Sequence, residues 1–349
     1  MRRLLSVLLL FAVLCSITGC SVFSETYVSQ RPHQGAHSST QSGQQMVSSY
    51  PEIYSALVSL VAQGEFSGVL ILSDLSEQVG RSYMQAAVKN VMTQDPIGAY
   101  AVENIRFDMG SNAGRLAIGV HIDYSRSRSD INGIKTVRNM DEAEQLIVQT
   151  LEQAAGSLVM RVEQFEQMDF SEFVRSYAAV NASMIMEIPQ VMTAVYPHSG
   201  QNRLVELTFT YQNSQENLRQ MQALVRPVFT AAELYVQGES SPRKKFQQLY
   251  SFLIERTDYK VHSSVTPAYS LLFDGVGDSL AFASVYATMC RQAGLECRVI
   301  NGTKDGVNRA WNRVVISNRV YYIDLIDAAQ GGRLQFKTAA EMTDYLWER

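Results

Sequence analysis

The sequence predicts an α+β protein made of several small units, each with helices packed on a sheet. Apolar residues recur at helical spacing in some segments, as at Ile53, Leu57 and Leu60, and alternate with polar ones in others, as over residues 116–123. Toward the C-terminus, one long helical pattern precedes three successive strand patterns, the order of an α+β arrangement. The 349 residues are 46% hydrophobic, so two or three domains can each have a core.

The first twenty residues have the layout of a secretory signal. Two arginines near the start precede an apolar run over residues 4–14, which is shorter than the roughly 20 residues that a membrane-spanning helix needs. The run ends in Ile17-Thr18-Gly19-Cys20, which resembles the bacterial lipobox. That resemblance implies removal of residues 1–19 and attachment of acyl chains such as palmitate at Cys20, where several chains hold a protein more firmly than one. The alternative is an ordinary cleaved signal with a chance cysteine.

Charge and composition bear on location and partners. The formal charge of -4 gives no reason to expect a nucleic-acid partner, because such proteins usually carry a basic patch. We expect an exported protein that is held at the cell membrane or the outer membrane by the lipid on Cys20. Residues 20–49 are rich in Ser, Gln, His, Thr and Gly, so they are expected to form a flexible tether. His33 and His37 lie in this tether, where a solvated linker is a better interpretation than a metal site.

Two α/β units are expected to follow the tether. Gly68 to Leu72 has the pattern of a buried strand, and Gly156 to Met160 repeats it 88 residues later. Arg115 to Ala117 recurs at the same offset, with helix, strand, helix and strand in the same order, which indicates a duplicated unit. A chance similarity is the alternative. Pro227 and a turn beginning at Gly238 mark the next boundary. The expected divisions are a signal peptide at 1–19, a tether at 20–49, repeat units at 50–138 and 139–226, and a C-terminal domain at 227–349.

A series of short motifs occupies residues 240–327 in a characteristic order. The motifs are Asp258-Tyr259, Ala268-Tyr269, Gly275-Val276-Gly277-Asp278-Ser279, Ala293-Gly294-Leu295, Asn301-Gly302, Arg309-Ala310-Trp311-Asn312 and Tyr321-Tyr322-Ile323-Asp324. Together they resemble the bacterial transglutaminase-like domain, a relative of papain-type cysteine proteases. The resemblance implies a central helix packed on an antiparallel sheet, with peptide or amide groups as the ancestral substrates.

Two of the three catalytic positions depart from the family's pattern. The family uses a Cys at a helix N-terminus as nucleophile, a His as general base and an Asp that orients the imidazole. Ser279 stands at the Cys position and Arg309 at the His position, and only Asp324 is kept. A serine hydroxyl needs an adjacent base, and a guanidinium cannot serve as one. We therefore expect no catalysis, a Ser279 that caps the helix, and an ion pair between Arg309 and Asp324.

The remaining chemically interesting side chains give weaker signals. His262 is the nearest histidine before Ser279 in the sequence, but no motif places it beside the hydroxyl. Trp311 and Tyr269 are candidates for lining the substrate cleft that the family resemblance implies, although a core position suits Trp311 as well. Cys290 and Cys297 are expected to be buried thiols, with a disulfide as the alternative in an exported protein. No metal or cofactor is expected.

The leading interpretation is a surface-anchored lipoprotein that lacks catalysis. Its degenerate transglutaminase-like domain would bind a peptide or protein, or would scaffold an envelope assembly. One alternative is an active acyl-transfer or amide-hydrolysing enzyme that uses Ser279. Another is that the repeat units bind an envelope component while the C-terminal domain is structural. The peptide expectation follows from the resemblance alone, since a fold does not determine a function.

Overall fold

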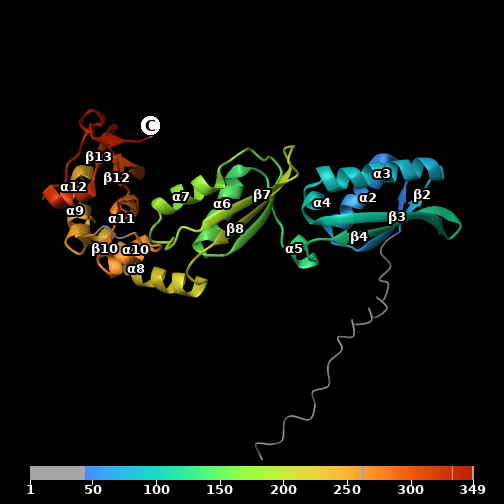
Figure 1. Cartoon of the computed structure of the whole chain (residues 1–349), viewed down its shortest axis with the longest axis horizontal. Helices are drawn as coiled ribbons and strands as arrows, with labels where there is room; N and C mark the ends of the chain where they lie inside the picture. Colours follow the sequence, from blue (N-terminus) through green and yellow to red (C-terminus); the bar gives the residue numbers. More distant parts are fainter. Residues whose placement is uncertain (1–43, 261–262, 332, 348–349) are drawn as a thin grey trace, which may run out of the picture. The chain divides into compact units, whose positions relative to one another are not determined.

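The computed structural model describes residues 44–260, 263–331 and 333–347, and its elements are labelled in Figure 1. Cys20, His33, His37 and His262 lie outside the described residues, so the predictions about them stay predictions. No helix in the described part of the chain has the length and apolar character needed to cross a membrane.

The first repeat unit is a four-stranded sheet with helices packed against it (Figure 1). Its strand order is β1-β2-β4-β3, in which β1 runs parallel to β2 and the other pairs are antiparallel. Leu57, Met84 and Ile118 are fully buried between helices and sheet. The elements are β1 (Gln45–Val47), α2 (Tyr50–Ala62), β2 (Ser67–Leu72), α3 (Glu77–Gln94), α4 (Pro96–Ala101), β3 (Val102–Asn112) and β4 (Arg115–Tyr124).

The second repeat unit has the same sheet topology, and its sheet begins before the predicted boundary at residue 139, because β5 at residues 135–137 pairs with β6. Its strand order is β5-β6-β8-β7, again with one parallel pair and two antiparallel pairs. A core that includes Ile147, Met160 and Val205 lies between sheet and helices. The elements are β5 (Lys135–Val137), α6 (Met140–Glu152), β6 (Ser157–Val162), α7 (Phe170–Ala179), β7 (Gln190–Tyr196) and β8 (Arg203–Thr210). The short helix α5 (Arg128–Asn132) precedes them and buries Ile131 in the core of the first unit.

The offset between the two units is not a single value of 88 residues. Gln45 and Lys135 hold equivalent register positions, 90 residues apart, whereas Ile118 and Val205 are equivalent at 87 residues. The connections leading to β4 and β8 therefore differ in length, and no single spacing aligns both halves. The shared topology supports a duplication, and the duplication and the division of the chain into domains stay predictions.

Three local expectations are wrong. Folded structure begins before Tyr50, because the short β1 strand pairs with β2 inside the expected tether. The spacing of apolar residues after residue 170 predicts a helix from Ser171 to about Met186, but the helix ends at Ala179. Pro227 does not mark a boundary, since it lies inside a continuous helix. On either side of that proline, Val225 and Phe229 are buried in the core, which offsets the lost backbone hydrogen bond.

The C-terminal part packs a central helix on an antiparallel sheet of order β13-β12-β11-β14, so the α+β expectation is confirmed. Residues 281–290 of α11 are all buried, which places this helix at the centre of the core. The elements are α8 (Gln215–Tyr235), α9 (Pro242–Ile254), β9 (Asp258–Tyr259), α10 (Pro267–Phe273), β10 (Val276–Gly277), α11 (Ser279–Gln292), β11 (Cys297–Lys304), β12 (Val307–Ile316), β13 (Arg319–Ile323), α12 (Leu325–Gly331), the 3-10 helix η1 (Ala339–Glu341) and β14 (Tyr345–Leu346).

Candidate functional site

The start of α11 carries Ser279, the serine that the sequence predicts at the family's nucleophile position. The expectation that Ser279 caps the helix is wrong, because Asp278 occupies the cap and accepts from the Ala281 N–H at 2.9 Å. Ser279 is instead the first helical residue, and its Oγ accepts a hydrogen bond from the Ala310 N–H at 3.1 Å. The hydroxyl therefore joins the start of α11 to the strand that carries Arg309.

Arg309 and Asp324 form the ion pair that the sequence predicts. Arg309 Nε lies 2.9 Å from Asp324 Oδ2, and Nη2 lies 3.2 Å from Oδ1, so the contact is bidentate. The arginine side chain is 14% exposed and the aspartate side chain 1% exposed, so water has little access to the pair. Arg309 stands on β12 and Asp324 directly follows β13, which is the neighbouring antiparallel strand.

The remaining acceptor capacity of Asp324 is also used. Its Oδ1 accepts from the backbone N–H groups of Ile326 at 2.9 Å and Asp327 at 3.2 Å, at the start of α12. The Tyr345 hydroxyl lies 3.0 Å from Oδ2. A carboxylate has about four lone-pair sites, and this one meets a guanidinium, two amides and a phenol. Asp324 thus anchors the start of a helix as well as an arginine.

A second carboxylate extends the network. Asp327 contacts Lys304 Nζ at 2.5 Å, Arg309 Nη2 at 3.2 Å and Lys337 Nζ at 3.6 Å, and the Tyr345 hydroxyl lies 2.8 Å from its Oδ2. Burial raises the pKa of Asp327, but hydrogen bonds from Lys304 and Tyr345 outweigh it and hold the pKa below its ordinary value. Three cations therefore surround two carboxylates, and both carboxylates are satisfied within the protein.

Proton transfer at Ser279 has no candidate base among the described residues. The hydrogen-bond partner of its Oγ is the Ala310 amide, and the neighbouring Arg309 stays protonated in proteins. The described part of the chain also has no group of histidine, cysteine or carboxylate side chains that could hold a metal ion. Among the described residues, the Ser279 hydroxyl is thus held by a backbone amide of β12.

The two residues suggested for the cleft have different surroundings. Trp311 is fully buried and makes edge contacts with Tyr345 and Trp347, at centroid distances of 5.0 and 5.5 Å, so it belongs to a core. Tyr269 is half-buried and stacks on Phe273 at 5.0 Å. A cavity of about 370 Å³ borders the ion-pair network instead. Its lining residues are Asp324, Asp327, Ala328, Gln330, Gln335 and Lys337.

Cys290 and Cys297 are free, buried thiols, as expected. Burial and the neighbouring Cys297 raise the pKa of the Cys290 thiol well above its ordinary value. The Cys290 thiol is therefore not prepared to act as a nucleophile, because the reactive form is the thiolate.

The family comparison identifies the C-terminal region. Residues 230–324 match the transglutaminase-like superfamily, so the chain carries a transglutaminase-like domain. A comparison with curated proteins gave no match.

Solved structures give more distant likenesses. A TGase crystal structure is 12% identical, with 64% of this chain and 66% of that chain covered and a TM-score of 0.27. A putative cysteine protease from Cytophaga hutchinsonii is 14% identical, with 45% and 70% covered and a TM-score of 0.27. The periplasmic domain of TgpA from Pseudomonas aeruginosa is 15% identical, with 38% and 56% covered and a TM-score of 0.24.

Proposed function

We propose that this chain is a lipid-anchored cell-envelope protein whose transglutaminase-like domain binds a peptide or protein, or scaffolds an assembly, without catalysing a reaction. The observation that carries this proposal is the bidentate contact of Arg309 with Asp324 beside Ser279. In the family pattern the aspartate orients a histidine, whereas here the same aspartate holds a group that cannot accept a proton.

The physical argument concerns the ionisation of the Ser279 hydroxyl. A serine becomes a useful nucleophile only when an adjacent base removes its proton. The dipole of α11 favours a negative charge at its start by only about 0.3–1 kcal/mol, which is far too little to ionise a hydroxyl near neutral pH. The Ser279 hydroxyl also accepts a hydrogen bond from the Ala310 N–H, which supports a structural role for this side chain.

The anchoring part of the proposal rests on the N-terminal sequence. The short apolar run that ends in Gly19-Cys20 supports lipid attachment and export. A tether between the lipid and the folded part would place the domain near a membrane surface, where binding or scaffolding has an evident use.

A serine-reactive fluorophosphonate probe tests the non-catalytic part. We expect the purified full chain to show the same background labelling as its Ser279→Ala variant. The change leaves the other side chains around the site in place, so the variant is a matched control. Labelling of the natural chain that disappears in the variant would show an activated serine and favour the alternative of an active acyl-transfer or amide-hydrolysing enzyme.

Metabolic labelling tests the anchor. Cells that express the chain and are fed radioactive palmitate should yield a labelled protein in the membrane fraction. Cys20→Ala should lose both the label and the membrane association. Retention of the palmitate label by that variant would contradict lipid attachment at Cys20.

A further inference from the structure

Among the described residues, no strand pairs with one edge of β11 over most of its length. One side of β11 pairs with β12 from Cys297 to Lys304. On the other side, β14 pairs only with Thr303 and Lys304. Within the described residues, the stretch from Cys297 to Asn301 therefore has no strand beside it, whereas Gly302 lies against the Leu346 carbonyl of β14. Such an edge is a template for another extended chain.

The hydrogen-bonding direction of the open stretch follows from one contact. The Val315 N–H donates to the Glu296 carbonyl at 3.2 Å, so residue 296 directs its backbone groups toward β12. Because these directions alternate along an antiparallel strand, the N–H and C=O groups of Cys297 and Val299 point toward the open side. An incoming strand would find donors and acceptors at these two positions.

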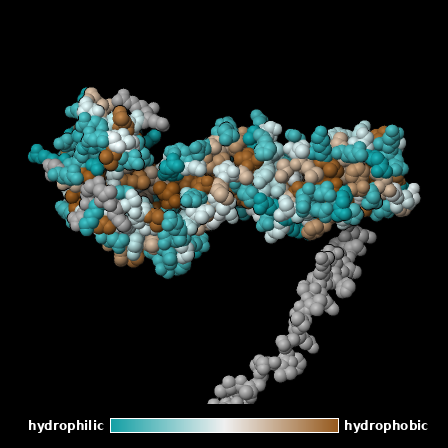
Figure 2. All heavy atoms as spheres, viewed as in Figure 1, coloured by the Kyte–Doolittle hydropathy of each residue, from teal (hydrophilic) through white to brown (hydrophobic). Residues whose placement is uncertain are grey.

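The open edge borders a groove of about 940 Å³. The opposite wall is helix α7 with the residues that follow it, where the apolar residues Phe173, Tyr177 and Val180 recur at helical spacing. Phe173 and Tyr177 are stacked, with ring centroids 6.5 Å apart. Figure 2 shows apolar side chains gathered around α7 beside the C-terminal domain. An edge strand facing an apolar helix stripe is the geometry in which proteins bind extended peptides by strand addition.

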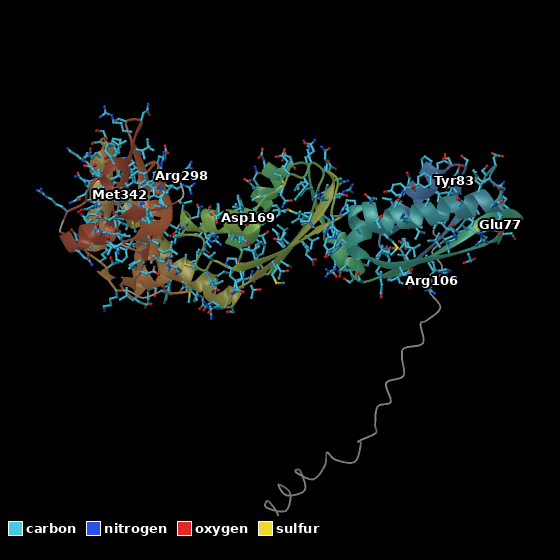
Figure 3. The ribbon with its side chains drawn as sticks, turned by 45° about the horizontal axis from the view of Figure 1, so that its top comes forward. Glu77, Tyr83, Arg106, Asp169, Arg298 and Met342 are labelled. Atoms are coloured by element: carbon cyan, nitrogen blue, oxygen red, sulfur yellow. The ribbon has the colours of Figure 1, made fainter. Side chains whose placement is uncertain are left out.

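The charges of the groove favour an acidic occupant. Five charged side chains line it: Glu172, Arg175, Arg291, Glu296 and Arg298. Arg175 pairs with Glu172, and Glu296 pairs with Arg313 on the next strand. Among the described residues, Arg291 and Arg298 have no carboxylate partner, and Arg291 donates instead to the Val180 carbonyl and Asn181. Arg298, labelled in Figure 3, is an exposed residue of β11, so a positive charge without a carboxylate partner among the described residues lies at this edge.

We propose that an extended peptide segment carrying Asp or Glu binds in this groove as an added strand on β11. The backbone groups of Cys297 and Val299 would hold its main chain, Arg298 and Arg291 would meet its carboxylates, and the stripe on α7 would receive apolar side chains. This inference rests on the proposed binding role and locates it. The groove lies at the end of α11, whose 14 residues span about 21 Å, and Ser279 lies at its start.

The test begins with selection of random nonapeptides displayed on phage against the full chain in detergent micelles. We expect the selected peptides to be rich in Asp or Glu together with β-branched or aromatic residues. One selected peptide, synthesised with a fluorescent label, is then titrated by anisotropy. Hydrogen exchange over residues 297–301 should slow when this peptide is bound.

Two groove variants have matched controls on the opposite edge of the same sheet. Val299→Pro removes an N–H that points outward, so the pairing with β12 is kept while peptide affinity falls at least ~10-fold. Its control is Val320→Pro on β13. Tyr322 exchanges backbone hydrogen bonds with Lys337 on the side away from β12. Because these directions alternate along a strand, the N–H of Val320, two residues earlier, also points away from β12. Arg298→Glu should lower the affinity similarly, and the exposed Arg319→Glu, with the same change of charge, should not.

The outcomes separate this inference from the proposed function. Selection of no peptide, or affinity unchanged in both groove variants, overturns the groove proposal and leaves the absence of catalysis to its own probe experiment. Loss of binding in Val299→Pro but also in Val320→Pro would show general damage to the sheet and would equally count against a specific edge. Concentration-dependent self-association abolished by Val299→Pro would make a second copy of the chain the occupant, contrary to the proposal.

Discussion

The two ends of helix α11 differ in how their polar groups are satisfied. At its start, Ser279, Arg309 and Asp324 belong to a network in which the serine hydroxyl and the carboxylate already have partners within the protein. At its end, Arg298 and the outward backbone groups of β11 face a groove with no partner among the described residues. The peptide binding that we propose would therefore occur away from the position where the family's chemistry occurs.

The largest expected effect on stability comes from breaking the ion pair between Arg309 and Asp324. Arg309→Met leaves the carboxylate of Asp324 buried without its bidentate partner, and we expect a loss of about 3 kcal/mol in unfolding free energy, measured by urea denaturation. Asp324→Asn on that background removes the stranded charge and keeps an acceptor for the start of α12. The double variant should regain part of the loss. Additive losses would show that the ion pair is not the stabilising contact.

A smaller effect is expected at the serine. Ser279→Ala leaves the Ala310 amide without its acceptor, which should cost about 1–3 kcal/mol of unfolding free energy by the same measurement. Ser263→Ala, which removes an exposed hydroxyl that donates to Asp278, is the matched control and should cost less. Equal losses in the two variants would argue against a structural role for the Ser279 hydroxyl.

The ion-pair network at the start of α11 should also make the stability of the fold depend on pH. The folded chain holds the pKa of Asp327 below its unfolded value of about 3.9, so the folded state binds fewer protons in that range. The resulting stability is present above about pH 4 and is lost as the pH falls through the folded-state pKa. Thermal melts from pH 6 to pH 2 should show a shallower decline in Asp327→Asn. An unchanged slope would contradict the assignment.

The smallest effect on stability is expected at Arg298, beside the groove at the other end of α11. Arg298→Ala removes an exposed side chain that has no ion-pair partner among the described residues, so the unfolding free energy should change by less than about 0.5 kcal/mol. Arg313→Ala, which gives up the pair with Glu296, is the comparison on the next strand. A loss at Arg298 as large as that at Arg309 would remove the distinction between the two ends.

The sequence predicted the elements whose signals are local. The apolar run of α11 and the three strands after it are recognisable in the sequence, and the ordered motifs predict that Ser279, Arg309 and Asp324 stand at catalytic positions of the family, which stays a prediction. Even the pairing of Arg309 with Asp324 followed, because a lone carboxylate beside a guanidinium has few other stable arrangements. Gly302 also fits its motif, since a Cβ there would lie 2.2 Å from the Leu346 carbonyl oxygen.

The remaining features depend on contacts between distant segments. Asp327, Lys304 and Tyr345 meet through the sheet and α12, and no spacing in the sequence indicates that they share a network. The short strand β1 carries too few residues for a pattern and is stabilised by pairing with β2. The groove is lined by α7 of the second repeat unit and by β11 of the C-terminal domain. Because these segments are far apart in the sequence, the pattern of neither one predicts a groove.

Turnover by the full chain tests the central claim most directly. Release of ammonia from a glutamine-containing peptide, with and without an added primary amine, should be measured for the natural chain, Ser279→Ala, and the double variant Ser279→Cys with Arg309→His. We predict no turnover above background for the first two. The double variant places a thiol at a helix start and an imidazole beside Asp324. Activity of this variant would agree with the proposal, whereas activity of the natural chain would not. Turnover by the natural chain that Ser279→Ala abolishes would contradict it.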